Sequence, residues 1–246
     1  MTTANTENRT ISLNEIGQKY FAAIQRLSDL TVFAWAGSRA VSEQGYDEVA
    51  RTVAGLPTSP FRLPFEVAKE ENEAWILKHS VNELLGLTMV FLEDVRKLAG
   101  LVTFNAAKAK ASGDLAALAA EINASYQLDF PERLAQLKEK YGITSPLEAE
   151  FLTIPKLGRL FFQTNGVVGN GETFELRLKA IQPPPQGGKE PVLGDYKRVW
   201  KSGERVTLSR QEHAAVFTTI SVFFSSLLNA VQEYAKRSGL APEPVA

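Results

Sequence analysis

The chain has 246 residues, of which 44% are hydrophobic, enough to bury a substantial core. Its 27 Lys and Arg residues nearly balance 28 Asp and Glu residues, so the net charge of -1 gives no global reason to expect nucleic acid or an anionic membrane as partner. Cysteine is absent, which excludes disulfides and every cysteine-ligated zinc or iron–sulfur site.

The two segments that bear on localisation are the N-terminus and the most hydrophobic run. Residues 1–10 are polar and lack the apolar stretch of a secretory signal, so we expect a cytoplasmic protein. Residues 214–231 are strongly hydrophobic but contain several Ser and Thr and one Asn. A membrane-spanning helix needs about 20 predominantly apolar residues. We therefore predict a buried helix here and no membrane segment.

The first half of the chain is predicted to be helical with one interruption. Ser12–Glu15 is a capping box, in which a Ser hydroxyl and a Glu carboxylate satisfy free N–H groups where a helix begins. This helix carries apolar residues as far as Trp35, and a short helix is expected near 47–53. Three prolines predict a loop at about 55–65, because proline lacks an N–H and favours extended backbone. A long helix is expected over 66–111.

Proline and glycine divide the following part into shorter helices. One is expected over 129–142. The stretch Ser145–Glu148 combines an N-cap Ser, Pro at the first helical position and Glu at the third, and so predicts another helix start. Pro155 is expected to kink or divide that helix. Asn165-Gly166 can adopt positive φ and is expected to end it.

A small β element is predicted between the last two long helices. Apolar and polar residues alternate over 172–181, which is typical of a half-buried strand, and a second strand is expected at 206–208. The Pro- and Gly-rich segment between them predicts a loop at about 183–200. A further capping box at Ser209–Glu212 begins the last helix, and residues 240–246 are expected to fray.

Together these signals predict a single, mainly helical domain over 1–246, a helical bundle with a hairpin or short strands. The last helix has apolar residues on more than one face, whereas a surface helix normally shows a single stripe. It must therefore be buried on two sides, either centrally in its own domain or against another subunit. The residues concerned are Phe217, Ile220, Phe224, Leu227 and Val231, with Val222, Phe223 and Ala230 beside them.

The side chains that carry most metal and acid–base chemistry are sparse. The only two histidines, His79 and His213, belong to no metalloprotease motif and to no visible catalytic triad. Two histidines without cysteine make a transition-metal site unexpected, and we predict neither metal nor cofactor. Clusters of Glu stand at helix starts, where the helix dipole favours them.

One short segment mixes aromatic and basic residues. Tyr196, Lys197, Arg198, Trp200 and Lys201 follow one another in a pattern that can stack on bases and hold phosphates. We keep it as a possible nucleic-acid contact. A surface loop whose aromatic residues anchor it to the body of the protein is the interpretation that we favour.

The end of the Pro-interrupted helix carries a resemblance to a known family. Arg159, then Thr164, Asn165 and Gly166, then a turn and a strand, and finally another long helix resemble the HEPN superfamily of helical domains, which occurs in bacterial toxin–antitoxin and abortive-infection proteins. Active members carry an Arg followed four to six residues later by His, often with Asn-Gly after the His. Here Arg159 matches the motif Arg, and Thr164 stands where the His should be.

The replacement of the motif His by Thr164 implies a function without catalysis. Active members cleave RNA without a metal, with a His close to the 2′-OH and an Arg that stabilises the phosphate. Thr164 cannot exchange a proton near neutral pH as His does. We therefore expect a non-catalytic binding or regulatory module for a protein or RNA partner, with a candidate cluster of Arg159, Thr164, Asn165 and Gly166. Because HEPN domains commonly pair, we also expect a homodimer.

Two alternatives stay open at this point. One is an enzyme with an unrecognised site built from Arg, Thr and Asn, or from carboxylates. The other is a helical domain with a small-ligand pocket lined by Trp35, Trp75 and the Phe-rich last helix. Aromatic residues at helical spacing are more often core than pocket, which disfavours the second alternative.

Overall fold

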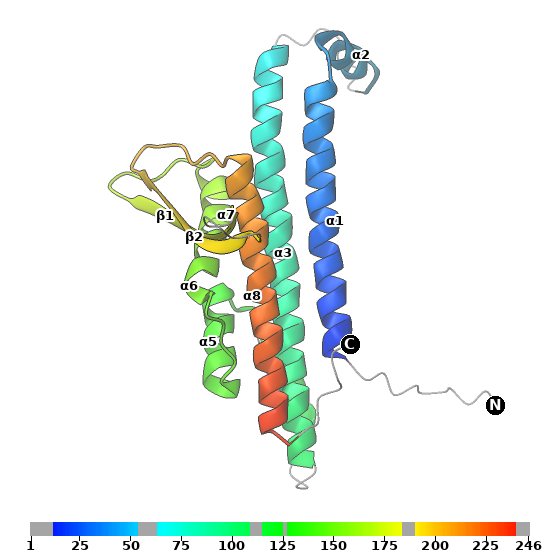
Figure 1. The fold of residues 1–246 in the computed structure, drawn as a ribbon, viewed down its shortest axis with the longest axis vertical. Helices are drawn as coiled ribbons and strands as arrows, with labels where there is room; N and C mark the ends of the chain where they lie inside the picture. Colours follow the sequence, from blue (N-terminus) through cyan, green and yellow to red (C-terminus); the bar gives the residue numbers. More distant parts are fainter. Residues whose placement is uncertain (1–11, 54–62, 109–114, 125–126, 184–189, 240–246) are drawn as a thin grey trace, which may run out of the picture. The chain divides into compact units, whose positions relative to one another are not determined.

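The structure, a computed structural model, describes residues 12–53, 63–108, 115–124, 127–183 and 190–239. It is mainly helical, with an antiparallel hairpin before the final helix, and this confirms the predicted fold class. The elements follow the chain in this order (Figure 1): α1 Leu13–Ala40, α2 Glu43–Val53, α3 Phe65–Lys108, α4 Leu115–Ala124, α5 Phe130–Tyr141, α6 Glu148–Phe151, α7 Thr153–Gln163, β1 Thr173–Gln182, β2 Val192–Lys201 and α8 Arg210–Arg237.

The contacts of the chain fall into two compact units, the first assembled from three segments and the second from two. The helices α1, α3 and α8 contribute residues to both units. The expected single domain stays a prediction. Unit 1 contains Met1–Ala23, Leu87–Leu152 and Thr219–Ala246, and unit 2 contains Ile24–Gly86 and Thr153–Thr218.

Unit 1 has an aromatic core. Phe91 of α3 stacks on Phe224 of α8 with ring centroids 3.8 Å apart, and Tyr20 of α1 meets Phe91 edge-on at 5.1 Å. Phe151 of α6 stacks on Phe223 of α8 at 4.1 Å. All five rings are buried. Large aromatic side chains contribute most to core stability because of the apolar area that they bury. The helix that follows Ser145-Pro146 therefore packs on the last helix, as the apolar pattern of both helices predicts.

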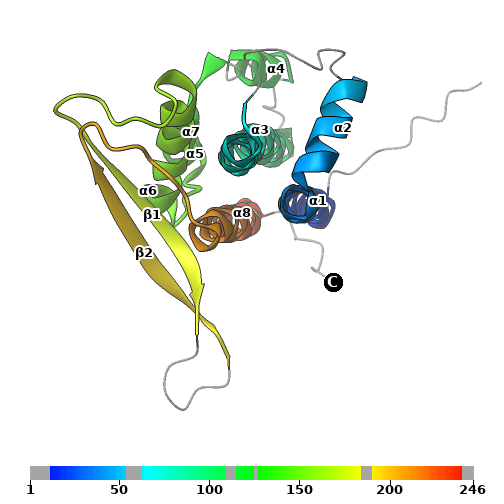
Figure 2. The ribbon, with the colours of Figure 1, turned by 90° about the horizontal axis from the view of Figure 1, so that it is seen from above.

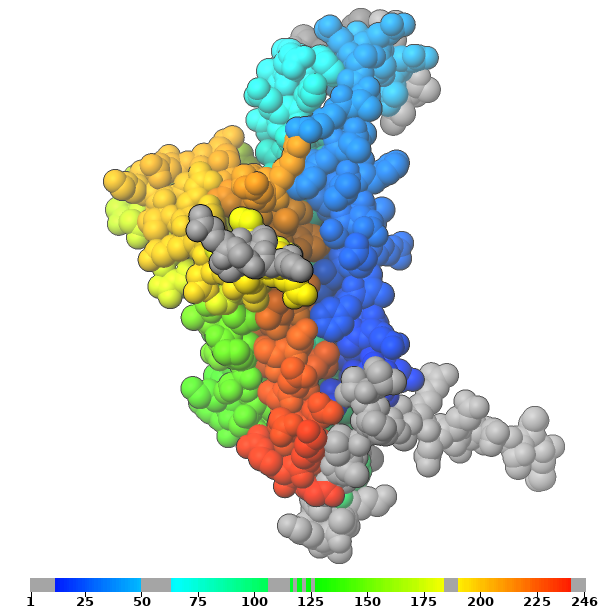
Figure 3. All heavy atoms as spheres, in the orientation of Figure 1, coloured from blue at the N-terminus to red at the C-terminus, as the bar shows by residue number. Residues whose placement is uncertain are grey.

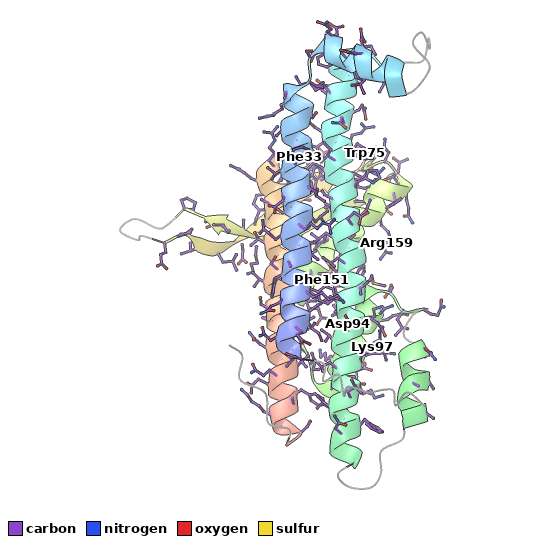
Figure 4. All side chains as sticks on the ribbon, turned by 90° about the vertical axis from the view of Figure 1, so that its right-hand side faces the viewer. Phe33, Trp75, Asp94, Lys97, Phe151 and Arg159 are labelled. Atoms are coloured by element: carbon purple, nitrogen blue, oxygen red, sulfur yellow. The ribbon has the colours of Figure 1, made fainter. Side chains whose placement is uncertain are left out.

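Several buried polar groups in unit 1 are paired. The Tyr20 hydroxyl donates to Asp94 Oδ2 at 2.6 Å, and burial together with this carboxylate raises the pKa of Tyr20. Figure 4 labels Asp94 on α3. Glu93, one residue earlier, accepts hydrogen bonds from Arg96 at 3.1 Å and from Arg133 of α5 at 3.0 Å. A buried charge without such partners would cost several kcal/mol.

The helix boundaries follow the local signals of the sequence. The side chain of Asp129 accepts a hydrogen bond from the N–H of Glu132, whose carboxylate accepts one from the N–H of Asp129, so α5 begins in a capping box and ends before Gly142. Ser145 Oγ accepts from the N–H of Leu147 at 3.1 Å, although the first helical residue of α6 is Glu148. The predicted helix start, with Ser145 as N-cap and Pro146 as first helical residue, is therefore wrong: Leu147 is the N-cap of α6 and has no side-chain cap hydrogen bond. The capping box of α5 is a short-range interaction of the kind that a sequence can reveal.

Pro155 divides the helix as expected. The chain leaves helical geometry at Leu152, between α6 and α7, and Pro155 lies in the first turn of α7. Proline has no N–H to donate to the carbonyl of Phe151, and its ring would crowd that carbonyl in a continuous helix. Thr153 Oγ1 then ties the start of α7 to β1, because it donates to Arg177 O at 3.1 Å and accepts from Arg177 N at 3.2 Å.

The hairpin differs from the prediction in its second strand. β1 agrees with the alternating pattern, and Phe174, Leu176 and Leu178 are buried. Its partner β2, however, occupies Val192–Lys201, within the loop predicted at about 183–200 (Figure 2). The predicted strand at 206–208 is not present. Only an isolated bridge, Val167 to Arg205, forms nearby.

Some predictions fall on residues that the structure does not describe. The loop at about 55–65 lies outside the described residues except for its last three positions, and the tail at 240–246 lies outside them altogether. By length and composition alone, α8 is apolar enough to cross a membrane, but half of its most apolar window is buried, as in the core helices of soluble proteins. The homodimer stays a prediction.

The stacked core of unit 1 gives a first test. We expect Phe224→Ala to lower the free energy of unfolding by about 3–5 kcal/mol, because it removes a buried ring and leaves a cavity. The matched control is Phe33→Ala, since Phe33 is 79% exposed on α1. The control should change stability by less than about 0.5 kcal/mol. Urea denaturation measures both, and equal losses would contradict the assigned core.

Candidate functional site

Three of the four residues that resemble the HEPN motif form the turn after α7. The Thr164 hydroxyl lies 2.6 Å from Val167 O and 3.1 Å from Leu160 O, so its hydrogen closes the turn onto backbone carbonyls. Asn165 and Gly166 have φ of 49° and 84°, which confirms the positive φ expected of them. The turn is therefore held by local hydrogen bonds in which the Thr164 side chain takes part.

Gly166 has a structural role that glycine alone fills easily. It is buried, its N–H donates to Leu160 O at 2.9 Å, and its carbonyl accepts from Val206 N at 2.8 Å. A Cβ at this position would lie 3.3 Å from Val206 O, on a backbone with positive φ. The Asn-Gly pair thus joins the end of α7 to the segment that precedes α8.

Arg159 lies one turn before the end of α7, and its side chain is exposed (Figure 4). Within the part of the chain that the structure describes, it makes no ion pair. The nearby hairpin carboxylate Glu175 is bound by Arg177 and Lys197. Arg159 therefore lies on the surface of α7, with no acidic or basic partner among the described residues.

The aromatic–basic segment is divided between the two faces of β2. Tyr196, Arg198 and Trp200 point to the inner face, and Trp200 is only 3% exposed. Its ring stacks on Phe174 of β1, so a base cannot stack on it without unpacking the hairpin. Lys197 and Lys201 are on the exposed face. The segment is therefore a strand, and the side chains on its inner face anchor it to the body of the protein.

Glu212 binds the polar side chains on the inner face of β2. Its carboxylate accepts two hydrogen bonds from Arg198, at 2.8 and 3.0 Å, one from the Tyr196 hydroxyl, and one from the N–H of Ser209 at 2.7 Å. Glu212 N in turn donates to Ser209 Oγ, which confirms the predicted capping box. Burial alone would raise the pKa of Glu212, but these donors hold it below its usual value. Figure 3 shows the start of α8, in orange, beside the golden β2.

His213, the next residue, is buried. Its Nε2 lies 2.6 Å from Ser80 Oγ of α3, and its ring meets Trp35 of α1 at 5.1 Å and Phe217 at 4.9 Å. Burial lowers the pKa of His213 to about 4, so the ring is neutral at pH 7. A Ser–His contact is also the core of nucleophilic sites. Here both groups are buried, and no carboxylate orients the His among the described residues.

A cleft of about 660 Å³ lies beside the predicted cluster. We call it the α3 cleft. It includes Asn165 of the predicted cluster, but neither Arg159 nor Thr164. It is lined by Leu63, by Ala68, Glu70, Glu71, Asn72, Glu73, Ala74, Trp75, Leu77 and Lys78 of α3, by Phe161 and Asn165, and by Arg205, Val206, Thr207 and Leu208.

The α3 cleft combines an exposed aromatic side chain with acidic residues. Trp75 is 57% exposed and lies 4.1 Å from His79, ring to ring (Figure 4). One turn earlier, Glu70 and Glu71 are exposed and have no ion-pair partner among the described residues. Glu73 is held by two arginines, Arg210 at 3.2 Å and Arg39 at 3.7 Å. The sequence offered one signal for this cleft, a Trp on the exposed side of a Glu-rich turn.

Comparison with known proteins adds no assignment. No family model, no curated protein and no solved structure matches this chain. Within the described ranges, no group of three or more His, Asp or Glu side chains is placed to hold a metal ion. The function must therefore be inferred from the geometry of the residues themselves.

The Glu212 network gives a second test. We expect Glu212→Gln to lower the free energy of unfolding by roughly 2 kcal/mol, because hydrogen bonds to a charged partner are lost and Arg198 is left without its carboxylate. Glu175→Gln is the matched control, since Glu175 makes its pairs on the exposed face of the same hairpin, and it should have a much smaller effect. Thermal and urea denaturation distinguish the two. A larger loss in the control would contradict the anchoring role.

His213 gives a third test, based on pH. In the unfolded chain the side chain of His213 has a pKa near 6.5, whereas in the folded protein it binds a proton only near pH 4. The free energy of unfolding should therefore fall by about 3 kcal/mol as the pH is lowered through this window. His213→Gln should remove that part of the pH dependence and keep a hydrogen bond to Ser80.

The control for this test is His79→Gln, which changes the exposed histidine. It should retain the pH dependence of the unmodified protein. Urea denaturation between about pH 7 and pH 4 is the measurement. Identical pH profiles for His213→Gln and the unmodified chain would contradict the burial of a neutral imidazole.

Proposed function

We propose that this chain is a non-catalytic helical module, HEPN-like in the order of its elements, that binds a segment of a partner protein in the α3 cleft. The observation that carries the proposal is Trp75, a large aromatic side chain left 57% exposed in a cleft whose carboxylates Glu70 and Glu71 have no ion-pair partner among the described residues. Partly exposed Trp residues are enriched among the residues that dominate binding energy at protein interfaces.

The size and lining of the α3 cleft support a peptide-like occupant. Its volume of about 660 Å³ lies within the range of about 300–1,000 Å³ that is usual for binding pockets. Trp75, Leu77 and Leu208 supply apolar surface, which an apolar side chain of the partner can bury. Phe162, which is 71% exposed next to Phe161, extends the aromatic surface, with the Lys78 ammonium 5.9 Å from its ring centre.

The charges favour a basic segment at one end of the cleft. Glu70 and Glu71 precede Trp75 by about one helical turn, whereas Lys78 and Arg205 are the cations among the lining residues. The acidic end repels phosphate groups and attracts Lys or Arg. The expected partner segment therefore carries an apolar anchor for Trp75, with basic residues on the side of Glu70. The same carboxylates disfavour RNA as the occupant.

The absence of catalysis is supported by the state of the candidate cluster. The Thr164 hydroxyl is engaged with backbone carbonyls, and it does not exchange protons near neutral pH. Arg159 is exposed without an acid or base partner among the described residues. RNA cleavage that survives chelation, and that Arg159→Ala abolishes, would contradict this part of the proposal.

Fluorescence anisotropy with labelled synthetic peptides tests the binding function. The probe is a short Leu/Lys peptide, and its charge-reversed control is a Leu/Glu peptide of the same length. We expect the Leu/Lys peptide to bind, and we expect Trp75→Ala and Glu70→Lys each to weaken binding by at least about tenfold, the loss that 1.4 kcal/mol produces.

Two matched variants control for surface changes outside the cleft. Phe33→Ala removes an exposed aromatic ring, and Glu83→Lys reverses an exposed charge further along α3. Neither residue lines the cleft, so both variants should bind like the unmodified chain. Equal binding of the Leu/Glu peptide, tighter binding of a single-stranded RNA, or unchanged binding by Trp75→Ala would each contradict the proposal.

A further inference from the structure

A second, smaller cavity lies in unit 2 between the residues of α1 and the first turns of α8. It has a volume of about 240 Å³, and we call it the Trp35 cavity. The lining residues that matter here are Val32 and Trp35 of α1, and Arg210, His213 and Phe217 of α8. It is separate from the α3 cleft, with which it shares no lining residue.

Aromatic rings form much of the wall. The ring of His213 lies between those of Trp35 and Phe217, at 5.1 Å from the first and 4.9 Å from the second. An apolar cavity of about 150 Å³ in another protein is enough to hold benzene. The Trp35 cavity therefore has room for one aromatic ring with a small substituent, and its walls offer the edge and face contacts that aromatic rings prefer.

One polar atom of the wall can take part in binding. The Ser80 hydroxyl donates to Leu77 O, so His213 Nε2 donates to Ser80 Oγ at 2.6 Å. In the neutral ring Nδ1 is then a hydrogen-bond acceptor. Within the described part of the chain it has no hydrogen-bond partner, and a donor group of a bound molecule can supply one.

The charge at the mouth of the cavity is positive. Arg210 and Arg39 share a single carboxylate, Glu73, at 3.2 and 3.7 Å, so one positive charge is left over among these three groups. Arg210 lines the cavity, and its guanidinium lies 5.6 Å from the centre of the Trp35 ring. It is also the first residue of α8, a helix of 28 residues whose N-terminus carries a positive partial charge.

We propose that the Trp35 cavity is a binding site for a small aromatic carboxylate. The ring packs against Trp35 and Phe217, the carboxylate pairs with Arg210, and His213 Nδ1 accepts a hydrogen bond from a polar substituent of the ring. This site does not depend on the peptide-binding function proposed for the α3 cleft, because the two sites have different walls.

Isothermal titration calorimetry of the full chain with benzoate tests the proposal. We expect benzoate to bind, and benzyl alcohol, which keeps the ring but lacks the charge, to bind at least about tenfold more weakly, as expected for the loss of a charged hydrogen-bond partner. This comparison needs no variant and so does not depend on the folding of one.

Three variants then locate the site. Arg210→Gln should weaken benzoate binding by at least about tenfold, whereas Arg26→Gln, which removes an exposed arginine of α1 that does not line the cavity, should change it by less than about twofold. Val32→Trp should abolish binding, because Val32 lines the cavity and, being 57% exposed, accepts a larger side chain without disturbing the core. No heat with millimolar benzoate, equal affinity for benzyl alcohol, or equal effects of the two arginine variants would overturn the proposal.

Discussion

The carboxylate of Glu212 is the interaction on which the rest of unit 2 depends. A single side chain caps the N-terminus of α8 and binds the inner face of β2 through Arg198 and Tyr196. Without these donors a buried carboxylate would be strongly destabilising, and without the carboxylate Arg198 would be left on the inner face of a strand. The network fixes the first turn of α8, and with it the positions of Arg210 and His213.

Those elements of the fold that rest on short-range chemistry were predictable from the sequence. The capping boxes at Asp129 and Ser209, the division of a helix near Pro155 and the positive φ of Asn165-Gly166 all depend on residues within four positions of one another. The alternation in β1 was visible for the same reason. It reflects one buried face and one exposed face of a single strand.

β2 was missed because its inner face is not apolar. Tyr196, Arg198 and Trp200 alternate with exposed residues. Because Arg198 is charged, the sequence does not show the alternation of apolar and polar residues that is typical of a half-buried strand. The charge of Arg198 is neutralised by Glu212 of α8. The reverse error occurred at 206–208, where apolar residues next to the Arg205 bridge line the α3 cleft without forming a strand. A pattern of residue types does not record which charges are compensated across the fold.

The candidate sites were even less accessible to sequence reasoning. Asn165 and Gly166 were predicted to end the helix, but the hydrogen bonds that engage the Thr164 hydroxyl follow from backbone geometry. Ser80 and His213 are 133 residues apart, and only the tertiary structure brings them together. Trp35 and Trp75, which were considered as walls of one pocket, line two different ones.

The ion pair between Glu73 and Arg210 joins these two pockets, because Glu73 lines the α3 cleft and Arg210 lines the Trp35 cavity. An anion that binds Arg210 competes with Glu73 for the guanidinium and leaves more negative charge on the cleft side. A basic segment in the cleft gains from that charge, and by drawing Glu73 toward itself it frees Arg210 for the anion. If both proposed sites are occupied, this shared salt bridge couples them, and thermodynamic linkage requires the coupling free energy to be the same in both directions.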